Sequence, residues 1–121
     1  MNQIITEGKA IIEVPAVKTV SKEMDVFYNP VMKFNRDIAV LLLNSIDKKN
    51  MNIADPLAGS GIRSIRFLLE LRKNKIKTIS INDYSSNAIK SIKNNLKLNK
   101  IKSKKIIIKN QDANLFLLNS S

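Results

Sequence analysis

The first apolar positions of the chain fall in two short runs on either side of a glycine. Ile4-Ile5 and residues 10–14 have the character of β-strands, and Glu7-Gly8-Lys9 separates them. Glycine tolerates the backbone conformations of tight turns, so this pattern predicts a β-hairpin that turns at Gly8. Pro15 ends the second strand, because proline cannot donate a hydrogen bond to a strand ladder.

A helical pattern follows a stretch that has no clear period. Ile38, Leu41 and Leu42 recur at the spacing of one helix face, and Asn35 precedes them. An asparagine side chain accepts hydrogen bonds from the first free amides of a helix, so we expect Asn35 to be the N-cap. The pattern therefore predicts a helix over residues 36–48.

From residue 51 onward, short buried strands alternate with amphipathic helices. The expected strands cover residues 51–54, 78–81 and 105–109. One expected helix covers residues 60–73, and a second begins after an N-cap at Ser85 or Ser86 and ends at residue 98. This β-α-β-α-β order predicts a parallel sheet with right-handed crossovers. The fold class is therefore α/β, and a small N-terminal β-hairpin and a helix precede the sheet.

The composition excludes several classes of protein. Of 121 residues, 44% are hydrophobic, which is enough for a core. Cysteine and histidine are absent, so disulfides and thiolate metal sites are excluded, and we predict no metal site. No apolar run approaches the roughly 20 residues of a membrane span, and no signal peptide is recognisable, so we expect a cytoplasmic protein without a membrane partner.

The charge is strongly positive. Twenty-one basic residues face ten acidic ones, giving a net charge of +11, which favours a nucleic-acid partner. Biased residue usage is the alternative, because 17 of the 21 cations are lysines and isoleucine and asparagine are also abundant. Lys90, Lys93 and Lys97 would form one exposed stripe, which is more typical of solubility than of RNA binding.

The stretch Asp55-Pro56-Leu57-Ala58-Gly59-Ser60-Gly61-Ile62-Arg63 lies between a predicted strand and a predicted helix. This is the context of a nucleotide-binding loop. Gly59 and Gly61 would let the backbone turn tightly and approach a ligand closely. The free amides at the helix N-terminus behind them suit a carboxylate or a phosphate. A purely structural turn remains the alternative.

Three acidic residues support an adenosine ligand. Asp55, Asp83 and Asp112 follow the carboxyl ends of three consecutive predicted strands, the edge at which open α/β sheets bind ligands. Asp83 comes 22 residues after Gly61, where a carboxylate accepts hydrogen bonds from both ribose hydroxyls. Asp112 would accept from the adenine amino group.

The loop favours S-adenosylmethionine over a dinucleotide. Ser64 stands where the third glycine of G-x-G-x-x-G would be, and no G-K-[ST] follows the loop. The second and third glycines of that motif admit a pyrophosphate, which S-adenosylmethionine does not have. We therefore expect S-adenosylmethionine, with an NAD-dependent oxidoreductase fragment as the less favoured interpretation.

The sequence also resembles a known family. Residues 27–37, F-Y-N-P-V-M-K-F-N-R-D, are similar to a signature of the tRNA guanine-26 N2-dimethyltransferases. Glu7-Gly8-Lys9-Ala10, Gly61-Ile62-Arg63, Asn82-Asp83 and Gln111-Asp112-Ala113-Asn114 match that family in the same order. The resemblance spans nearly the whole chain, and the residue 27–37 block is its most specific part.

The resemblance implies a Rossmann-like class I methyltransferase fold, S-adenosylmethionine as the methyl donor and N2 of guanine 26 in tRNA as the acceptor. It implies cofactor contacts from Arg36, Arg63, Asp83, Asp112 and Ala113. Arg36 and Arg63 would pair with the cofactor carboxylate, which matches a guanidinium fork. Arg66, one turn further on, is expected to make a salt bridge or face solvent. Phe27 or Tyr28 would stack on the target base or pack as a loop anchor.

The sequence departs from the family at its end. Family members continue with a strand, the acidic motif D-P-F-G-S-P, a second half of the sheet and a tRNA-binding domain, and this chain has no such motif. We expect residues 1–34 to form the hairpin and motif loop, and residues 35–121 to form the N-terminal half of a methyltransferase domain.

In the class I strand order, 3-2-1-4-5-7-6, the chain would hold strands 3, 2 and 1 only. The strand at 51–54 would then be an exposed edge and would associate with the missing half. No catalytic residue is assigned to this chain, and tRNA is its expected partner. The alternative function is a non-catalytic basic RNA-binding module or an inactive fragment.

Overall fold

The central sheet of the computed structural model has the predicted parallel order. The structure describes residues 2–15 and 28–120. In this part of the chain β3 (Met51–Asp55), β4 (Ile76–Asn82) and β5 (Ile106–Lys109) form a sheet of order β3-β4-β5, with both pairs parallel. α2 (Ile62–Glu70) connects the first pair and α3 (Ser86–Leu98) the second. The α/β class and the β-α-β-α-β order are therefore confirmed.

The N-terminal hairpin is also confirmed. β1 (Asn2–Glu7) pairs antiparallel with β2 (Ala10–Pro15), and Glu7 lies opposite Ala10, so Gly8 and Lys9 form a two-residue turn. Gly8 has φ +56°, which a glycine adopts without strain. The inward side chains of β2 at Ala10, Ile12 and Val14 are almost fully buried, which places the hairpin against the rest of the core.

Two asparagines, Asn95 of α3 and its C-cap Asn99, bind the outer edge of β2. The side-chain amide of Asn99 accepts from Ile11 N at 2.9 Å and donates to Ile11 O at 2.6 Å. Asn95, one turn earlier, accepts from Glu13 N at 2.8 Å and donates to Glu13 O at 3.3 Å. The two side chains thus satisfy backbone groups of β2 that a third strand would otherwise bind.

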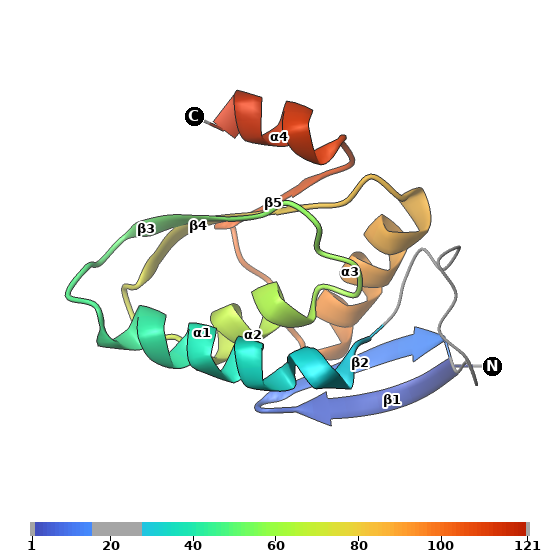
Figure 1. The fold of residues 1–121 in the computed structure, drawn as a ribbon, viewed down its shortest axis with the longest axis horizontal. Helices are drawn as coiled ribbons and strands as arrows, with labels where there is room; N and C mark the ends of the chain where they lie inside the picture. Colours follow the sequence, from blue (N-terminus) through green and yellow to red (C-terminus); the bar gives the residue numbers. More distant parts are fainter. Residues whose placement is uncertain (1, 16–27, 121) are drawn as a thin grey trace.

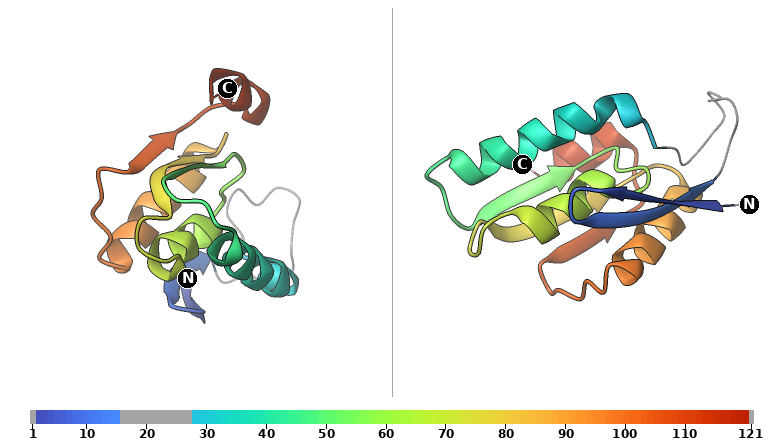
Figure 2. Two further views of the ribbon diagram at one scale, coloured as in Figure 1. Left: turned by 90° about the vertical axis from the view of Figure 1, so that its left-hand side faces the viewer. Right: turned by 90° about the horizontal axis from the view of Figure 1, so that it is seen from below.

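The helices cover the two faces of the sheet unequally. α1 (Lys33–Ser45), α2, α3 and the hairpin lie on one side, whereas α4 (Ala113–Ser120) lies on the other, as Figures 1 and 2 show. α4 was missed by the sequence analysis. Its Phe116 is buried, but Leu117 and Leu118 remain exposed, so α4 covers only part of its face of the sheet.

The first helix begins earlier than predicted, and Asn35 is not its N-cap. A 3-10 turn, η1 (Pro30–Met32), leads into it, and the Asn29 side chain caps this turn by accepting from Val31 N. α1 starts at Lys33, so Asn35 lies within its first turn; it ends at Ser45 rather than at residue 48. The proline-led turn starts the helical conformation before Asn35 is reached.

The apolar stripe of α1 faces away from the core. Ile38, Leu41 and Leu42 are 44%, 67% and 58% exposed, whereas Arg36 and Val40 are buried. The three residues share one face, as predicted, and no other segment of the described chain covers that face. The inward face instead carries the charged contacts described below.

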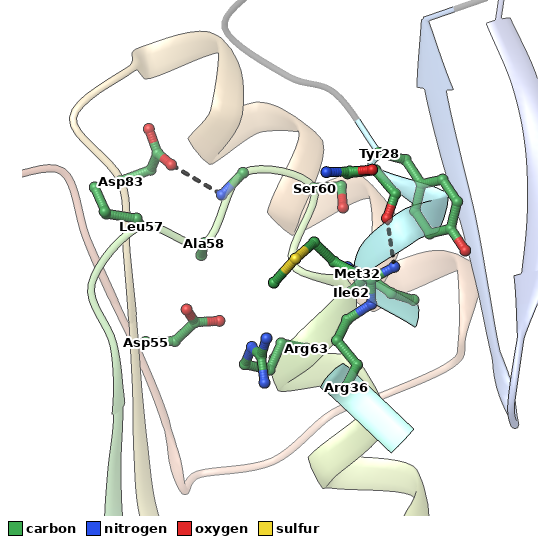
Figure 3. A pocket seen from close by; sticks show the side chains of 12 residues that line it. Tyr28, Met32, Arg36, Asp55, Leu57, Ala58, Ser60, Ile62, Arg63 and Asp83 are labelled. Atoms are coloured by element: carbon green, nitrogen blue, oxygen red, sulfur yellow. Dashed lines mark hydrogen bonds between the residues drawn. The ribbon is translucent and has the colours of Figure 1, made fainter. Parts of the chain in front are cut away.

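The loop between β3 and α2 runs along the carboxyl edge of the sheet (Figure 3). α2 starts at Ile62, two residues later than predicted, because Gly61 adopts φ +84° as its N-cap; it ends at Glu70 because Leu71 is extended. Ser85 caps α3, as one of the two alternatives predicted, by accepting from Ala88 N.

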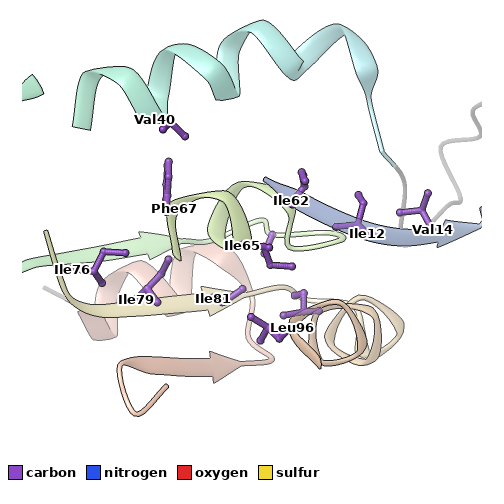
Figure 4. Packing of buried hydrophobic residues seen from close by; sticks show 13 residues of the cluster. Ile12, Val14, Val40, Ile62, Ile65, Phe67, Ile76, Ile79, Ile81 and Leu96 are labelled. Carbon is purple, nitrogen blue, oxygen red and sulfur yellow. The ribbon is translucent and has the colours of Figure 1, made fainter. Parts of the chain in front are cut away.

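The hydrophobic core lies between the sheet, α2 and the hairpin (Figure 4). Ile65 of α2, Ile79 and Ile81 of β4 and Ile12 of β2 are fully buried there. β3 is an edge of the sheet in the part of the chain that the structure describes, as expected for an incomplete sheet. None of the described helices is long and apolar enough to cross a membrane.

Candidate functional site

A pocket of about 330 Å³ lies at the carboxyl ends of β3 and β4. Its walls come from the β3–α2 loop, the first turn of α2, the start of α1 and the segment before η1. The lining residues include Tyr28, Arg36, Asp55, Gly59, Arg63 and Asp83 (Figure 3). The structure thus brings together five residues that the sequence singled out as cofactor contacts or strand-end acids, from segments up to 47 positions apart: Arg36, Asp55, Gly59, Arg63 and Asp83.

The glycine loop is held in place by backbone and carboxylate contacts. Ala58 N donates to Asn82 O at 2.9 Å, and Gly59 N donates to Oδ2 of Asp83 at 2.8 Å. Gly59 has φ +57° and no atom lies within 4 Å of the place a Cβ would occupy, so its surface is open. Gly61 packs against Ile92 and Ile65 instead, and it shapes the start of α2 without lining the pocket.

Asp83 follows β4 directly and faces the pocket. Besides Gly59 N, it accepts from Ser85 N through Oδ1 at 3.0 Å. A carboxylate has about four acceptor positions, so these two bonds leave capacity for a ligand hydroxyl. The two backbone bonds fix the orientation of the carboxylate toward the pocket.

Asp55, the last residue of β3, is a buried acid in the pocket wall. It is 8% exposed and accepts from Ser64 Oγ at 2.6 Å. Burial raises the pKa of the Asp55 carboxyl, and the nearby charge of Asp83 adds to the effect, while the Ser64 hydrogen bond and the charge of Arg63 oppose it. The carboxyl therefore holds a proton more readily than an exposed aspartate does.

Arg63 lies in the first turn of α2 and extends along the pocket. Its Nη2 donates to Oδ1 of Asn35 at 3.1 Å, which links α2 to the first turn of α1. A cation beside the free amides of a helix N-terminus suits an anionic group such as a carboxylate. Asn35 therefore orients Arg63, a role that the sequence analysis did not assign to it.

Arg36 also lines the pocket, but its guanidinium is largely occupied. Nε and Nη2 donate to the two carboxylate oxygens of Glu7 at 2.8 and 2.7 Å, and Nη2 also donates to Asn29 O at 3.0 Å. The guanidinium lies 5.0 Å from the centre of the Tyr28 ring, a cation–π contact. Among the contacts with described residues, Nη1 is the one guanidinium nitrogen left for a ligand, so the predicted pairing of Arg36 with a cofactor carboxylate would have to use Nη1.

Glu7, at the end of β1, is the centre of a buried ionic cluster. It is 1% exposed and also accepts from Tyr28 Oη at 2.5 Å and from Arg66 Nη1 at 3.0 Å. Burial alone would raise the pKa of the Glu7 carboxyl, but the hydrogen bonds and charges of its partners, Arg36 first, outweigh burial and lower that pKa to about 2. Glu7 is therefore ionised over the whole physiological range.

Arg66 extends this cluster across α2, so of the two alternatives predicted for it, a salt bridge or solvent exposure, the structure has the salt bridge. Arg66 pairs with Glu7, with Asp37 of α1 at 2.5 Å and with Glu70 at 2.8 Å. The cluster of Glu7, Arg36, Asp37, Arg66 and Glu70 thus joins the hairpin, α1 and α2. The Glu7-Gly8 segment was predicted as the hairpin turn and as part of a family match, whereas the ionic contacts of Glu7 were not predicted.

Asn82 is a further residue whose role the sequence did not reveal. It is fully buried at the end of β4. Its Nδ2 donates to Pro56 O at 3.1 Å and to Gln111 O at 2.9 Å, and its Oδ1 accepts from Gln111 N at 2.9 Å. Asn82 therefore connects the loop after β3 to the segment after β5.

The remaining predicted residues lie outside the pocket or outside the described chain. Asp112 is exposed and caps α4 through Oδ1, which accepts from Asn114 N at 2.9 Å and from Leu115 N at 3.3 Å. Neither Asp112 nor Ala113 is among the lining residues that the structure describes. Phe27 falls outside the described residues. Their predicted contacts stay predictions.

The chain matches a family model along almost its whole length. The model describes the N2,N2-dimethylguanosine tRNA methyltransferases and covers residues 8–121. A tRNA (guanine(26)-N(2)/guanine(27)-N(2))-dimethyltransferase of Aquifex aeolicus is 49% identical over 119 residues, which is 95% of this chain and 30% of that protein. A tRNA (guanine(26)-N(2))-dimethyltransferase of Methanocaldococcus jannaschii is 44% identical over 119 residues, or 94% and 31%.

A solved structure shares the fold. Trm1 from Pyrococcus horikoshii in complex with S-adenosyl-L-methionine superposes with a TM-score of 0.79 at 35% identity, covering 97% of this chain and 32% of that one. Trm5b from Pyrococcus abyssi, at 20% identity and a TM-score of 0.69, shares the fold alone. The chain spans about 30% of the length of the curated relatives it matches.

Proposed function

Since the chain belongs to the N2,N2-dimethylguanosine tRNA methyltransferase family, we propose that it is the cofactor-binding N-terminal part of an enzyme that methylates N2 of guanine 26 in tRNA. The observation that carries this proposal is the pocket at the carboxyl ends of β3 and β4, where Asp83, Gly59 and Arg63 converge. Open α/β sheets bind nucleotide-like ligands at this edge. We propose that residues 35–121 contribute the first half of the methyltransferase domain.

The donor set of the pocket fits S-adenosylmethionine. Asp83 offers free acceptor positions to the two ribose hydroxyls, and Arg63, beside the N-terminus of α2, suits the carboxylate of the methionine portion. The open surface of Gly59 lets the ligand approach the backbone. The chemistry supplied by this cofactor when bound is a methyl group on a positively charged sulfur.

Each predicted residue then has a defined task. Arg36 contributes through Nη1 and is held in place by Glu7. Asp112 and Ala113 are proposed to reach the adenine end, in a segment that Asn82 ties to the glycine loop through Gln111. Gly61 sets the start of α2, and Phe27 is proposed to contact the target base.

The acceptor side of the reaction belongs to the remainder of the enzyme. A base within a folded tRNA must be extruded before its N2 can meet the methyl group. N2 of guanine is a weak nucleophile because its lone pair is delocalised into the ring. Because the methyl donor already has a good leaving group, positioning of N2 contributes most to the catalysis. The motif D-P-F-G-S-P is not in this sequence. We therefore propose that the residues that act on N2 lie in the remainder of the enzyme.

The test is calorimetric binding of S-adenosylhomocysteine to the chain and to Asp83→Asn. Asparagine keeps one acceptor oxygen for Gly59 N, but it loses the acceptor for Ser85 N and the charge offered to the ribose. A hydrogen bond to a charged group contributes about 1.5–3 kcal/mol, so we expect its loss to weaken the binding of S-adenosylhomocysteine roughly ten- to 150-fold. The matched control is Asp47→Asn, an exposed aspartate in the loop after α1, which should bind normally.

Equal binding by wild type and Asp83→Asn would refute the role of Asp83. A chain that gives a cooperative urea transition but binds no S-adenosylhomocysteine would contradict the proposal itself. If such a chain still binds tRNA, the alternative of a non-catalytic RNA-binding module is favoured.

A further inference from the structure

Almost all of the net positive charge of the chain lies in its second part. Residues 1–70 contain nine basic and eight acidic residues, whereas residues 71–121 contain twelve basic and two acidic ones. Both of these acids, Asp83 and Asp112, follow the carboxyl ends of strands. The segments that lead into the amino ends of β4 and β5 therefore carry cations only.

A groove of about 420 Å³ lies at these amino ends, between the carboxyl ends of α2 and α3. Five cations line it: Arg72, Lys73, Lys100, Lys102 and Lys105. Its floor is apolar and includes Phe67 and Ile76, which also belong to the hydrophobic core (Figure 4). No acidic side chain lines the groove within the described residues.

The five cations are not used in holding the fold together by ion pairs. The salt bridges found within residues 2–15 and 28–120 involve Glu7, Asp37 and Glu70 as acids, and none includes a groove cation. Glu70, the acid closest in sequence to Arg72, is bound by Arg66 and by Lys9 N. The groove thus presents a concentrated charge without internal compensation.

Lys100 occupies a backbone conformation that favours glycine. Its φ is +57°, and it follows the C-cap of α3 in a Schellman motif, in which Ile101 N donates to Leu96 O and Lys100 N to Lys97 O. A side chain at this position costs conformational free energy that glycine would avoid. A lysine with this cost, placed on the rim of the groove, points to a use for its charge.

We propose that this groove binds the phosphodiester backbone of the tRNA substrate, on the edge of the sheet opposite the cofactor pocket. The proposal rests on the proposed function for the identity of the RNA. Several separate cations along an open groove match a row of phosphates, and contacts of this kind position a nucleic acid without reading its sequence. The stripe formed by Lys90, Lys93 and Lys97 on the outer face of α3 is not part of the site.

The first test compares two triple variants with the same change in net charge. One replaces Lys100, Lys102 and Lys105 with glutamine, and the control replaces Lys90, Lys93 and Lys97 with glutamine. Binding of an unmodified tRNA transcript with guanine at position 26 is measured between about 50 and 200 mM salt. Each lost phosphate contact lowers the salt slope by about one, so the groove variant should lose about three and the control less than one.

The second test is Lys100→Gly, which removes the charge and the backbone strain together. We expect the urea midpoint to rise while tRNA affinity falls, a combination that misfolding cannot produce. Three results would overturn the proposal. The two triple variants could lose the same salt slope, neither could lose any, or Lys100→Gly could keep its tRNA affinity unchanged.

S-adenosylhomocysteine binding separates this inference from the proposed function. Groove variants should bind it as tightly as the wild type, because the groove lies on the other edge of the sheet. If the groove variants bind both the cofactor and tRNA as the wild type does, the groove proposal is overturned and the proposed function stands. If the folded wild type binds no cofactor, the proposed function is contradicted. The tRNA binding of the two triple variants can still be compared in that case.

Discussion

Replacing Glu7 with glutamine removes one buried negative charge and keeps the size of the side chain. The Glu7 carboxylate accepts four hydrogen bonds, one from Tyr28, two from Arg36 and one from Arg66. Arg36 is 6% exposed, and Glu7 is its ion-pair partner among the described residues. The variant therefore leaves a buried guanidinium without a counter-charge, which is a costly state.

Two independent routes give similar magnitudes for this cost. The pKa of Glu7 falls from 4.5 to about 2, and at 1.36 kcal/mol for each pKa unit this corresponds to about 3 kcal/mol of stability at neutral pH. Breaking a buried ion pair by removing one partner typically costs about 3–5 kcal/mol. We therefore expect Glu7→Gln to lower the free energy of unfolding at neutral pH by about 3–5 kcal/mol.

The pH dependence has a definite sign. The pKa of Glu7 is lower in the folded state than in the unfolded state, so its contribution is present above about pH 4.5 and is lost as the pH falls toward about 2. Wild type and Glu7→Gln should therefore converge in stability over this interval. Other acids lose their contributions in both proteins, so the difference between the two isolates Glu7.

The assay is urea denaturation followed by far-UV circular dichroism, repeated between about pH 7 and pH 3. Glu13→Gln is the matched control, because Glu13 lies on the same hairpin and its carboxylate accepts from Asn2 Nδ2 at the surface. The control should change stability by less than about 1 kcal/mol. A Glu7→Gln variant that behaves like this control, or whose deficit is unchanged at about pH 3, would refute the reasoning.

Two further substitutions test other contacts of the fold by the same denaturation assay. Gly8→Ala would place a Cβ against Glu70 Oε2 and 2.8 Å from Arg66 Nε, at φ +56°. We therefore expect a loss of about 2 kcal/mol, against about 1 kcal/mol for Gly59→Ala, which is strained but unobstructed. Equal losses would show that the contacts with Glu70 and Arg66 are irrelevant. Asn95→Ala should lower the free energy of unfolding by about 2–3 kcal/mol, because it leaves backbone groups of Glu13 and Ser60 unpaired. Asn94→Ala, at an exposed position, should leave stability unchanged. Similar values for the two variants would contradict the structure.

The parts of the fold that the sequence predicts are those that depend on neighbours in the chain. The hairpin turn at Gly8 and the Ser85 cap each rest on residues within a few positions of one another. The positions of Asp55 and Asp83 follow from strand ends alone, because parallel strands place their carboxyl ends at a common edge. Local sequence is therefore sufficient to locate the turn, the cap and both acids.

The features that escaped prediction depend on distant contacts. Arg36 was matched to a cofactor carboxylate, but its guanidinium is bound by Glu7, 29 residues earlier. The apolar stripe of α1 indicates a buried face, yet this face is exposed in the described part of the chain, which periodicity alone does not reveal. α4 was missed because Leu115, Phe116, Leu117 and Leu118 are apolar on all sides, so no helical period stands out.

The pairing of β2 with α3 has a consequence for the time at which the chain can finish folding. Ile11 and Glu13 find their partners in Asn99 and Asn95, which lie 88 and 82 residues later. At a synthesis rate of about 5–20 residues per second, the ribosome adds the asparagines roughly 4–18 s after the hairpin. Throughout this interval the outer edge of β2 is open to pairing with other nascent chains, so Asn95 and Asn99 also close off a route to aggregation.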